Sequence, residues 1–240
     1  MTELLLGSIT FLTSIIAAVV GIGGGMMLIA ILPSFLPLNA LIPVHGLTQV
    51  SSNLSRAFFG YKDIQYEIIP KFLIGSILGI GLFAGILSFI SLDYVPLFIG
   101  VYILLSLWSQ KFNQKIKRYE NYYLAGFFQT GLSMVVGATG PLTMTLLFKD
   151  YNDKDKVVAT GAALMTITHF LKVAVFIYFG FVFFDYIWII LAMIFGAVLG
   201  SFVGTRARNL VDGKKFTIIL KILLTLLAIK LIVDIFIKMI

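Results

Sequence analysis

Apolar segments that are long enough to cross a membrane recur along almost the whole chain. A helix needs about 20 mostly apolar residues to cross the ~30 Å hydrocarbon core of a bilayer, where every backbone polar group must be hydrogen-bonded inside the segment. Hydrophobic residues make up 60% of the 240 residues and charged residues 12%, a composition that predicts an all-α, multi-pass integral membrane protein. The expected segments are 4–36, 40–60, 68–90, 94–110, 120–148, 155–181, 186–205 and 216–238.

Two of these segments are broken by glycine. Segments 4–36 and 120–148 are too long for one upright span. The first contains GIGGG at residues 21–25, and the second contains GATGP at residues 137–141. Glycine costs about 1 kcal/mol and proline about 3 kcal/mol in a helix interior. Both segments are therefore expected to unwind or bend there, with Pro141 in the first turn of a new helix.

The two breaks belong to an internal repeat. Gly21 and Gly137 are 116 residues apart, and further pairs of residues fall at the same offset before the match slips to 121. Two halves, each a broken segment followed by three spans, are the expected architecture. The further pairs are Asn53 with His169 and Arg56 with Lys172 at offset 116, and Gly75 with Gly196 and Gly79 with Gly200 at offset 121.

The distribution of Lys and Arg predicts the orientation of the halves. Short cytoplasmic loops collect these residues, and the loop at 111–119 is the most basic, with Lys111, Lys115, Lys117 and Arg118. One crossing per segment would place the basic residues at 206–215 on the opposite side from that loop. We therefore expect each broken segment to form a hairpin of two half-helices that returns to its own side. The halves then become repeats of inverted topology.

This scheme divides the chain into a first membrane repeat, a basic cytoplasmic loop and a second membrane repeat, at 1–110, 111–119 and 120–240. Glu3 and the lack of a basic stretch before the first apolar run predict a retained helix rather than a cleaved signal. The loops at 61–67, 110–119, 149–154 and 206–215 are expected to be cytoplasmic, and those at 91–94 and 182–186 external.

Polar and charged residues at and after each break mark a candidate anion site. A half-helix that begins at Met26 or Pro141 presents unpaired N–H groups and the positive end of its dipole near mid-membrane depth. A charge inside a span is costly, so Arg56 and Lys172 are expected to face a water-filled anion path. The expected substrate-binding residues are Gly21, Gly23, Gly24, Gly25, His45, Gln49, Ser52, Asn53, Arg56, Gly137, Thr139, Gly140, Thr166, His169 and Lys172.

Each of these features also has a purely structural interpretation. Glycines permit close helix packing, and the spacing of four among the later glycines of both halves is typical of packing faces. Long cationic side chains can extend to the membrane interface. Buried histidines are often hydrogen-bonded packing groups, and Ser and Thr hydroxyls often bond to their own helix backbone.

The chain resembles the TauE/SafE family of sulfite and organosulfonate permeases. The resemblance rests on the glycine motif at 21–25, the polar second segment through Arg56, the basic central loop and the second copy at 137–141, in which the glycine run is diluted. It covers essentially the full chain. It implies an inner-membrane secondary transporter of small sulfur-containing or carboxylate anions that is not an enzyme and uses no cofactor.

Other functional classes fit parts of the sequence. Residues 131–134 (GLSM) resemble the nucleophile loop of a rhomboid protease, in which His169 could act as base to Ser133. An anion channel could use the same broken helices. The absence of cysteine disfavours thiol chemistry. The two histidines are far apart in the sequence and have no carboxylates near them, which disfavours a metal site. The absence of a Gly-Lys-Ser/Thr motif disfavours ATP chemistry.

The formal charge of +7 resides largely in short loops, which indicates topology rather than nucleic-acid binding. The expected partners are therefore a small anionic substrate and the lipid bilayer. The sequence is also compatible with a homo-oligomer.

Overall fold

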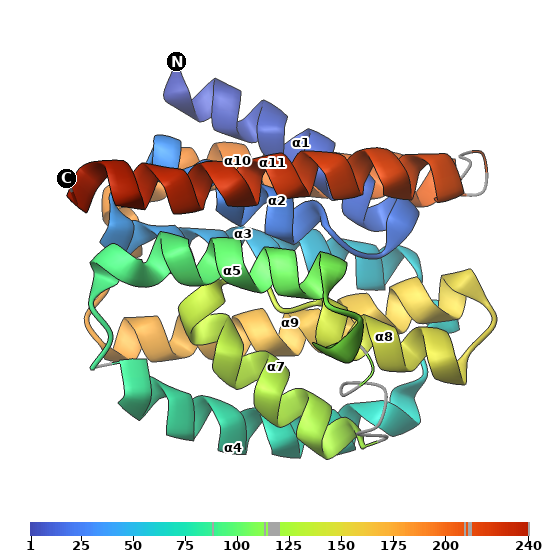
Figure 1. The fold of residues 1–240 in the computed structure, drawn as a ribbon. Coiled ribbons are helices and arrows are strands. Elements are labelled where there is room, and N and C mark those ends of the chain that lie inside the picture. Colours follow the sequence, from blue (N-terminus) through green and yellow to red (C-terminus); the bar gives the residue numbers. More distant parts are fainter. Residues whose placement is uncertain (88, 113, 115–120, 209, 211–212, 240) are drawn as a thin grey trace.

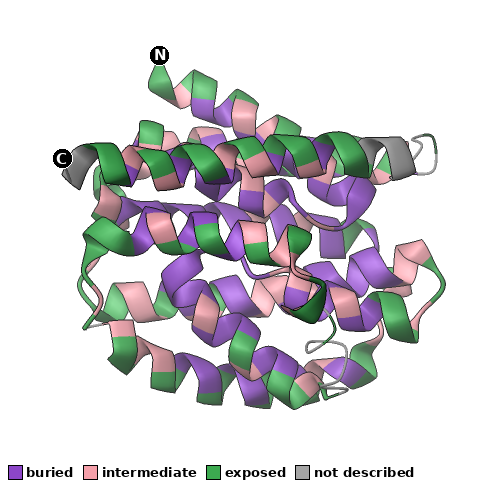
Figure 2. Cartoon of the chain, in the orientation of Figure 1, coloured by how far each residue is buried: buried purple, intermediate pink, exposed green. Residues whose placement is uncertain are grey.

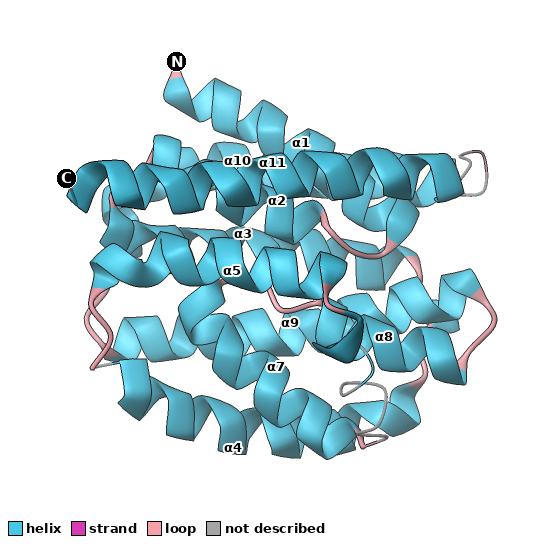
Figure 3. Cartoon of the chain, in the orientation of Figure 1, coloured by secondary structure: helices cyan, strands magenta, loops and turns pink. Residues whose placement is uncertain are grey.

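The computed structural model describes residues 1–87, 89–112, 114, 121–208, 210 and 213–239, with no side chains described at 213–216 and 238–239. All regular structure in these residues is helical (Figure 3). The expected all-α membrane class is confirmed. By length and composition, four of the described helical stretches could cross a membrane, and they are Thr2–Val20, Tyr66–Leu87, Lys154–Tyr178 and Phe183–Ala207.

The first half of the chain follows the expected segments closely. Its first apolar segment is split into two helices, and the next three segments each form one helix. Short 3-10 turns join several of them, at Leu32–Ser34, Tyr61–Asp63, Tyr66–Ile68 and Leu92–Tyr94. The helices are α1 (Thr2–Val20), α2 (Gly24–Ile31), α3 (Leu38–Phe59), α4 (Ile69–Leu87) and α5 (Val95–Trp108).

The second half has the same order of elements. Its first segment is again split into two helices, and a 3-10 turn at Phe183–Tyr186 precedes the fourth helix. Much of the predicted basic loop, including Lys115, Lys117 and Arg118, lies outside the described residues. The helices are α7 (Tyr122–Val136), α8 (Pro141–Asp150), α9 (Lys154–Tyr178), α10 (Ile187–Ala207) and α11 (Gly213–Met239).

Both glycine-rich sequences interrupt a helix, as predicted. Gly21 and Gly23 have φ angles of 91° and 93°, and Gly137, which ends α7, has a φ of 76°. Side chains disfavour this left-handed region, whereas glycine enters it freely. Figure 1 shows that the chain reverses direction at both breaks, so that α2 turns back from the end of α1 and α8 turns back from the end of α7. Each broken segment is therefore a helical hairpin.

The helices of the two halves pack on one another in a reciprocal pattern. Helix α1 packs along α10 and α4 along α7, while α3 packs against α9 and α5 against α11. Matching the helices of the two halves in order pairs α1 with α7, α3 with α9, α4 with α10 and α5 with α11. Under this match the α1–α10 contact corresponds to the α4–α7 contact, and the α3–α9 and α5–α11 contacts each correspond to themselves. A two-fold relation between the halves would produce such pairing. It supports the inverted repeat, which we retain as a proposal.

Close glycine contacts follow the same exchange. A Cβ built on Gly75 would lie 1.9 Å from the carbonyl oxygen of Tyr123, and one on Gly196 would lie 2.1 Å from that of Gly7. Gly7 and Tyr123 are 116 residues apart, and Gly75 and Gly196 are 121 apart. The two contacts therefore join residues that correspond to each other at the two sequence offsets. These glycines are helix-packing faces, as their spacing predicts. A second such pair of contacts is Gly79 with Phe127 and Gly200 with Phe11.

The ends of the helices that adjoin basic loops lie on one side of the molecule. In Figure 1, α5 and α8 end, and α9 and α11 begin, at the right-hand side. This arrangement agrees with the placement of the Lys- and Arg-containing loops on one side of the membrane. The assignment of that side to the cytoplasm stays a prediction.

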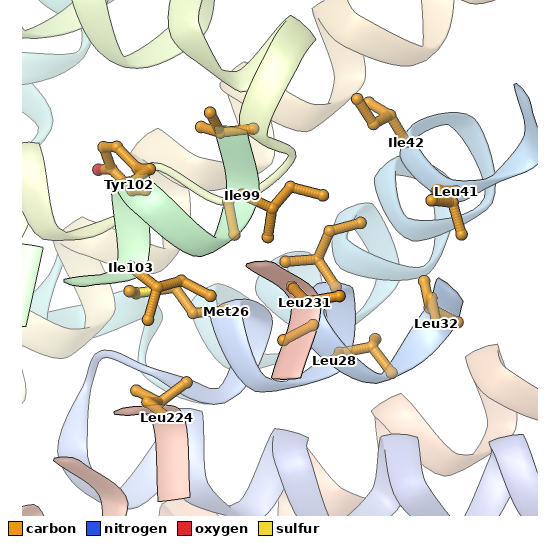
Figure 4. Close-up of a cluster of buried hydrophobic side chains, with 14 of the residues drawn as sticks. Met26, Leu28, Leu32, Leu41, Ile42, Ile99, Tyr102, Ile103, Leu224 and Leu231 are labelled. Carbon is orange, nitrogen blue, oxygen red and sulfur yellow. The ribbon is translucent and has the colours of Figure 1, made fainter. Parts of the chain in front are cut away.

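Burial separates an inner core from a lipid-like outer surface. Figure 2 shows buried positions concentrated on the inward faces of the helices and exposed positions on the outward faces. Large apolar side chains such as Leu78, Phe195 and Ile219 are exposed there, as expected for contact with acyl chains. In the core, apolar side chains of α2, α3, α5 and α11 meet, among them Met26, Leu41, Ile103 and Leu231 (Figure 4).

Candidate functional site

A narrow cavity lies where the two glycine breaks meet. Its volume is about 30 Å³, which restricts any occupant to a few atoms in this conformation. Both breaks contribute backbone to its wall, and α3 and α9 contribute polar side chains. The lining residues are Ala17, Gly21, Ile22, Gly23, Gly24, Gly25, Met26, Gln49, Arg56, Ala138, Gly140, Pro141, Met165 and His169.

Arg56, near the end of α3, supplies the charge at this cavity. Its side chain is 2% exposed, and its Nη2 donates a hydrogen bond to Oδ1 of Asn53. The Asn53 Nδ2 in turn donates to the carbonyl oxygen of Gln49 at 2.7 Å. The Nε and Nη1 of Arg56 have no hydrogen-bond partner among the described residues. Leaving a buried donor unsatisfied costs about 1–3 kcal/mol, and more for a charged group, so these N–H groups favour an acceptor in the cavity.

Lys172, the repeat-related cation on α9, has different surroundings. It is fully buried, and its Nζ donates a hydrogen bond of 2.7 Å to the carbonyl oxygen of Gly137. The ammonium group thereby satisfies a backbone carbonyl that the second break removes from its helix. Lys172 does not line the cavity. The two cations therefore lie at the sequence offset of 116 but contact different groups.

No carboxylate side chain neutralises these cations in the interior. Among the described residues, the buried polar and charged set contains no Asp or Glu. None of the described ion pairs involves Arg56 or Lys172. An unpaired buried charge costs several kcal/mol. An anion in the cavity would reduce that cost.

Two histidines lie beside the cavity. The rings of His45 and His169 are in a T-shaped arrangement with centroids 5.7 Å apart. His45 is held by a 2.9 Å hydrogen bond between its Nε2 and the carbonyl oxygen of Gly25, whereas His169 itself lines the cavity. The Nδ1 atoms of both rings have no partner in the described part of the chain. His169 is thus a second polar group available to an occupant.

Gln129 on α7 organises the second break. Its backbone oxygen accepts a 2.7 Å hydrogen bond from Oγ1 of Thr139. Its side-chain Oε1 accepts from the backbone N of Thr143 at 3.1 Å and from the Thr143 hydroxyl. The sequence interpretation missed Gln129, although an amide in an apolar helix next to a break is a usable signal.

Hydroxyl pairs join the helices around the site in both halves. Ser14 and Ser52 are hydrogen-bonded at 2.9 Å, and Thr130 and Thr168 at 3.1 Å. The second pair lies at offset 116 from the first. These contacts connect the first helix of each hairpin to the long helix that follows it, so the Ser52 side chain contributes to helix packing.

The structure brings many of the predicted residues to the cavity but not all. Thr166 donates to the carbonyl oxygen of Ala162 in its own helix at 2.9 Å and does not line the cavity. Five further predicted residues surround the cavity without lining it, and these are His45, Asn53, Gly137, Thr139 and Lys172. The predicted residues that line it are Gly21, Gly23, Gly24, Gly25, Gln49, Arg56, Gly140 and His169.

Apolar lining residues were missed, because small and apolar side chains in a membrane helix carry no chemical signal. The rhomboid-like alternative gains no support. The hydroxyl of Ser133 donates to the carbonyl oxygen of Thr130 at 2.7 Å, and no hydrogen bond joins it to His169 within the described residues. The missed lining residues are Ala17, Ile22, Met26, Ala138, Pro141 and Met165.

Comparison with known proteins identifies the family. The family model "Sulfite exporter TauE/SafE" matches residues 6–231, nearly the whole chain. Comparisons with curated proteins and with solved structures gave no match. The match includes both glycine breaks, Arg56 and Lys172. The chain therefore belongs to the TauE/SafE sulfite exporter family, whose members are membrane transporters rather than enzymes.

Proposed function

We propose that this protein is an inner-membrane secondary transporter of small anions, with sulfite, organosulfonates or related sulfur-containing or carboxylate anions as substrates. One observation carries the proposal. Arg56 is buried at a small cavity between two broken helices, with two N–H groups unpartnered and no carboxylate buried among the described residues. Membership in a family of sulfite exporters supports the substrate class.

The broken helices add a second source of positive potential. Helices α2 and α8 begin at Gly24 and Pro141, both of which line the cavity. The first N–H groups of a helix lack partners within the helix, and the dipole places partial positive charge there. Glycines on the cavity wall allow an anion to approach the backbone closely. In this proposal the anion is held by the guanidinium group of Arg56 and by the first N–H groups of α2. Helix α8 contributes its dipole alone, because Pro141 has no N–H, the Leu142 N–H donates to the carbonyl oxygen of Thr139, and the Thr143 N–H donates to Oε1 of Gln129.

The reciprocal packing suggests how the site alternates between the two sides. Each hairpin packs most closely on the fourth helix of the other half, through α1 with α10 and α4 with α7. Glycine contacts with backbone make both interfaces tight, so each pair is expected to move as one unit. Rocking of one unit against the other around the breaks would expose the cavity to one side at a time.

Counterflow into proteoliposomes tests the function. Vesicles preloaded with unlabelled sulfite, an organosulfonate or a small carboxylate would be diluted into labelled substrate, with and without a pH gradient. With the membrane potential clamped at zero by K⁺ and valinomycin, a carrier accumulates label transiently through exchange, whereas an anion channel lets the label rise only to its external concentration. The proposal predicts counterflow with at least one of these anions. Failure of all of them to exchange would contradict it.

A further inference from the structure

A second and larger cavity adjoins the central one. Its volume is about 330 Å³, and it lies among α5, α8 and α11. It shares four lining residues with the central cavity, and these are Ile22, Gly23, Met26 and Pro141. The two breaks therefore form the common wall of both spaces.

The common wall consists mainly of apolar side chains. Leu220 on α11 is buried against the first break, where a Cβ built on Gly23 would lie 2.5 Å from Cδ2 of Leu220. Met26 is also buried beside it. Methionine has three flexible side-chain torsions and adapts its shape readily. Small shifts of Ile22, Met26 and Leu220 would join the two spaces.

The outer part of the larger cavity carries a cation. Lys221 lines it, and its Nζ lies 3.8 Å from the centroid of the exposed Trp108 ring. The Trp108 indole N–H donates to the Thr225 hydroxyl at 3.0 Å, which fixes the ring under the ammonium group. No described carboxylate pairs with Lys221. Its charge is therefore available to attract an anion.

The larger cavity lies toward the end of the molecule that adjoins the basic loops. Its lining comes from the last residues of α5, the length of α8 from Pro141 to Phe148 and the early turns of α11. These helix ends face the right-hand side of Figure 1. A lysine there would raise the local anion concentration in front of the wall.

We propose that this larger cavity is the vestibule through which an anion passes between the central cavity and the side of the membrane that carries the basic loops. Ile22, Met26 and Leu220 form the barrier, which is closed in this structure. Lys221 attracts the anion to the barrier, and Arg56 binds it beyond. This inference rests on the proposed transport function.

Single cysteines test the vestibule, because the natural chain contains none. Thr145 lines the larger cavity on α8, whereas Ile222 is exposed on α11 and lines neither cavity. In inside-out membrane vesicles, Thr145→Cys is expected to react with the anionic reagent 2-sulfonatoethyl methanethiosulfonate at least about tenfold faster than Ile222→Cys, because a charged reagent avoids hydrocarbon. An organosulfonate, which does not react with the reagent as sulfite does, should slow the reaction of Thr145→Cys.

Lys221 provides an independent readout. Lys221→Gln is expected to raise the apparent KM for transport several-fold at low ionic strength, and the difference should shrink above about 0.1 M salt, where the Debye length is about 10 Å. Lys221→Arg should behave like the wild type, because the role is one of charge. An unchanged KM for Lys221→Gln at every salt concentration would contradict the role of Lys221.

The results separate failure of the vestibule from failure of the function. If Thr145→Cys transports normally but does not react, the larger cavity faces lipid and the route is wrong. Reaction only from the opposite membrane side would also overturn the route. In both cases transport that depends on Arg56 would persist. If the wild type exchanges none of the tested anions, the proposed function itself fails.

Discussion

Replacing Arg56 by Gln is expected to weaken anion binding strongly. Glutamine keeps a polar group near Asn53 but removes the charge and the two unpartnered N–H groups. A hydrogen bond from a charged donor contributes about 1.5–3 kcal/mol. Loss of two such bonds to a bound anion amounts to about 3–6 kcal/mol, or roughly a hundred- to ten-thousand-fold in affinity at 1.4 kcal/mol per tenfold.

The same substitution is expected to raise the thermal stability of the anion-free protein. The wild type carries a buried cation with unsatisfied donors, which costs about 1–3 kcal/mol. Arg56→Gln removes this cost, so the anion-free variant should unfold at a higher temperature than the anion-free wild type. Anion at 100 times its Kd should stabilise the wild type by about 2.7 kcal/mol and leave the variant unchanged. A residue that lowers stability while binding ligand is typical of a functional site.

The assay is thermal unfolding of the detergent-purified protein across a sulfite titration. Arg206→Gln is the matched control, because Arg206 is an exposed cation whose guanidinium lies 3.5 Å from the ring centroid of Phe202. It makes the same change in net charge and should retain the anion-dependent stabilisation. If Arg56→Gln shows the wild-type dependence on sulfite, Arg56 does not bind the anion and the reasoning is refuted.

Three further predictions concern the framework around the site. Lys172→Met should lower the free energy of unfolding by about 1.5–3 kcal/mol, because the carbonyl oxygen of Gly137 loses its charged donor. An unchanged melting temperature would argue against a stabilising role for this hydrogen bond. Gly79→Ala should reduce the yield of monodisperse protein in size-exclusion chromatography, since its Cβ would lie 2.1 Å from a carbonyl oxygen of α7, whereas Gly81→Ala meets nothing within 4 Å and should not; equal yields would count against the tight α4–α7 contact. In intact cells, an impermeant thiol reagent should label Asp93→Cys but not Lys62→Cys, and the reverse pattern would invert the proposed orientation.

Much of the fold follows from local features of the sequence. Segment length and apolar content predict the helices, and the glycine motifs predict both breaks, because only glycine adopts positive φ without strain. The offsets of 116 and 121 predict which residues of the two halves make equivalent contacts. The spacing of Gly75 and Gly79 predicts a packing face, and the structure confirms it.

The different contacts made by the individual site residues could not be predicted from such local features. The hydroxyl groups of Ser52 and Thr166 could each face a cavity, bond to a neighbouring helix or bond to their own helix. The choice depends on side-chain rotamers that cannot be read from the sequence pattern. Arg56 and Lys172 occupy equivalent positions, yet a carbonyl oxygen lies within reach of one ammonium group, whereas two guanidinium N–H groups stay unpartnered. Such differences arise from tertiary placement over distances of a few ångströms.

Gly24 shows how one residue can serve packing and the site together. The sequence predicts it as a site residue, and it lines the central cavity. A Cβ at Gly24 would, however, lie 2.0 Å from the carbonyl oxygen of Thr13, so a larger residue would separate α2 from α1. Gly25 is the cleaner position for substitution, because its Cβ would lie 3.1 Å from the Oε1 atom of Gln49 at the cavity wall.

The most direct test of the anion site is the initial rate of labelled sulfite uptake into proteoliposomes, measured against sulfite concentration for the wild type, Arg56→Gln and Arg206→Gln. The wild type and Arg206→Gln are expected to saturate at the same concentration. Arg56→Gln is expected to stay at the rate of protein-free vesicles over that range. Saturation of Arg56→Gln at the wild-type concentration would contradict the account.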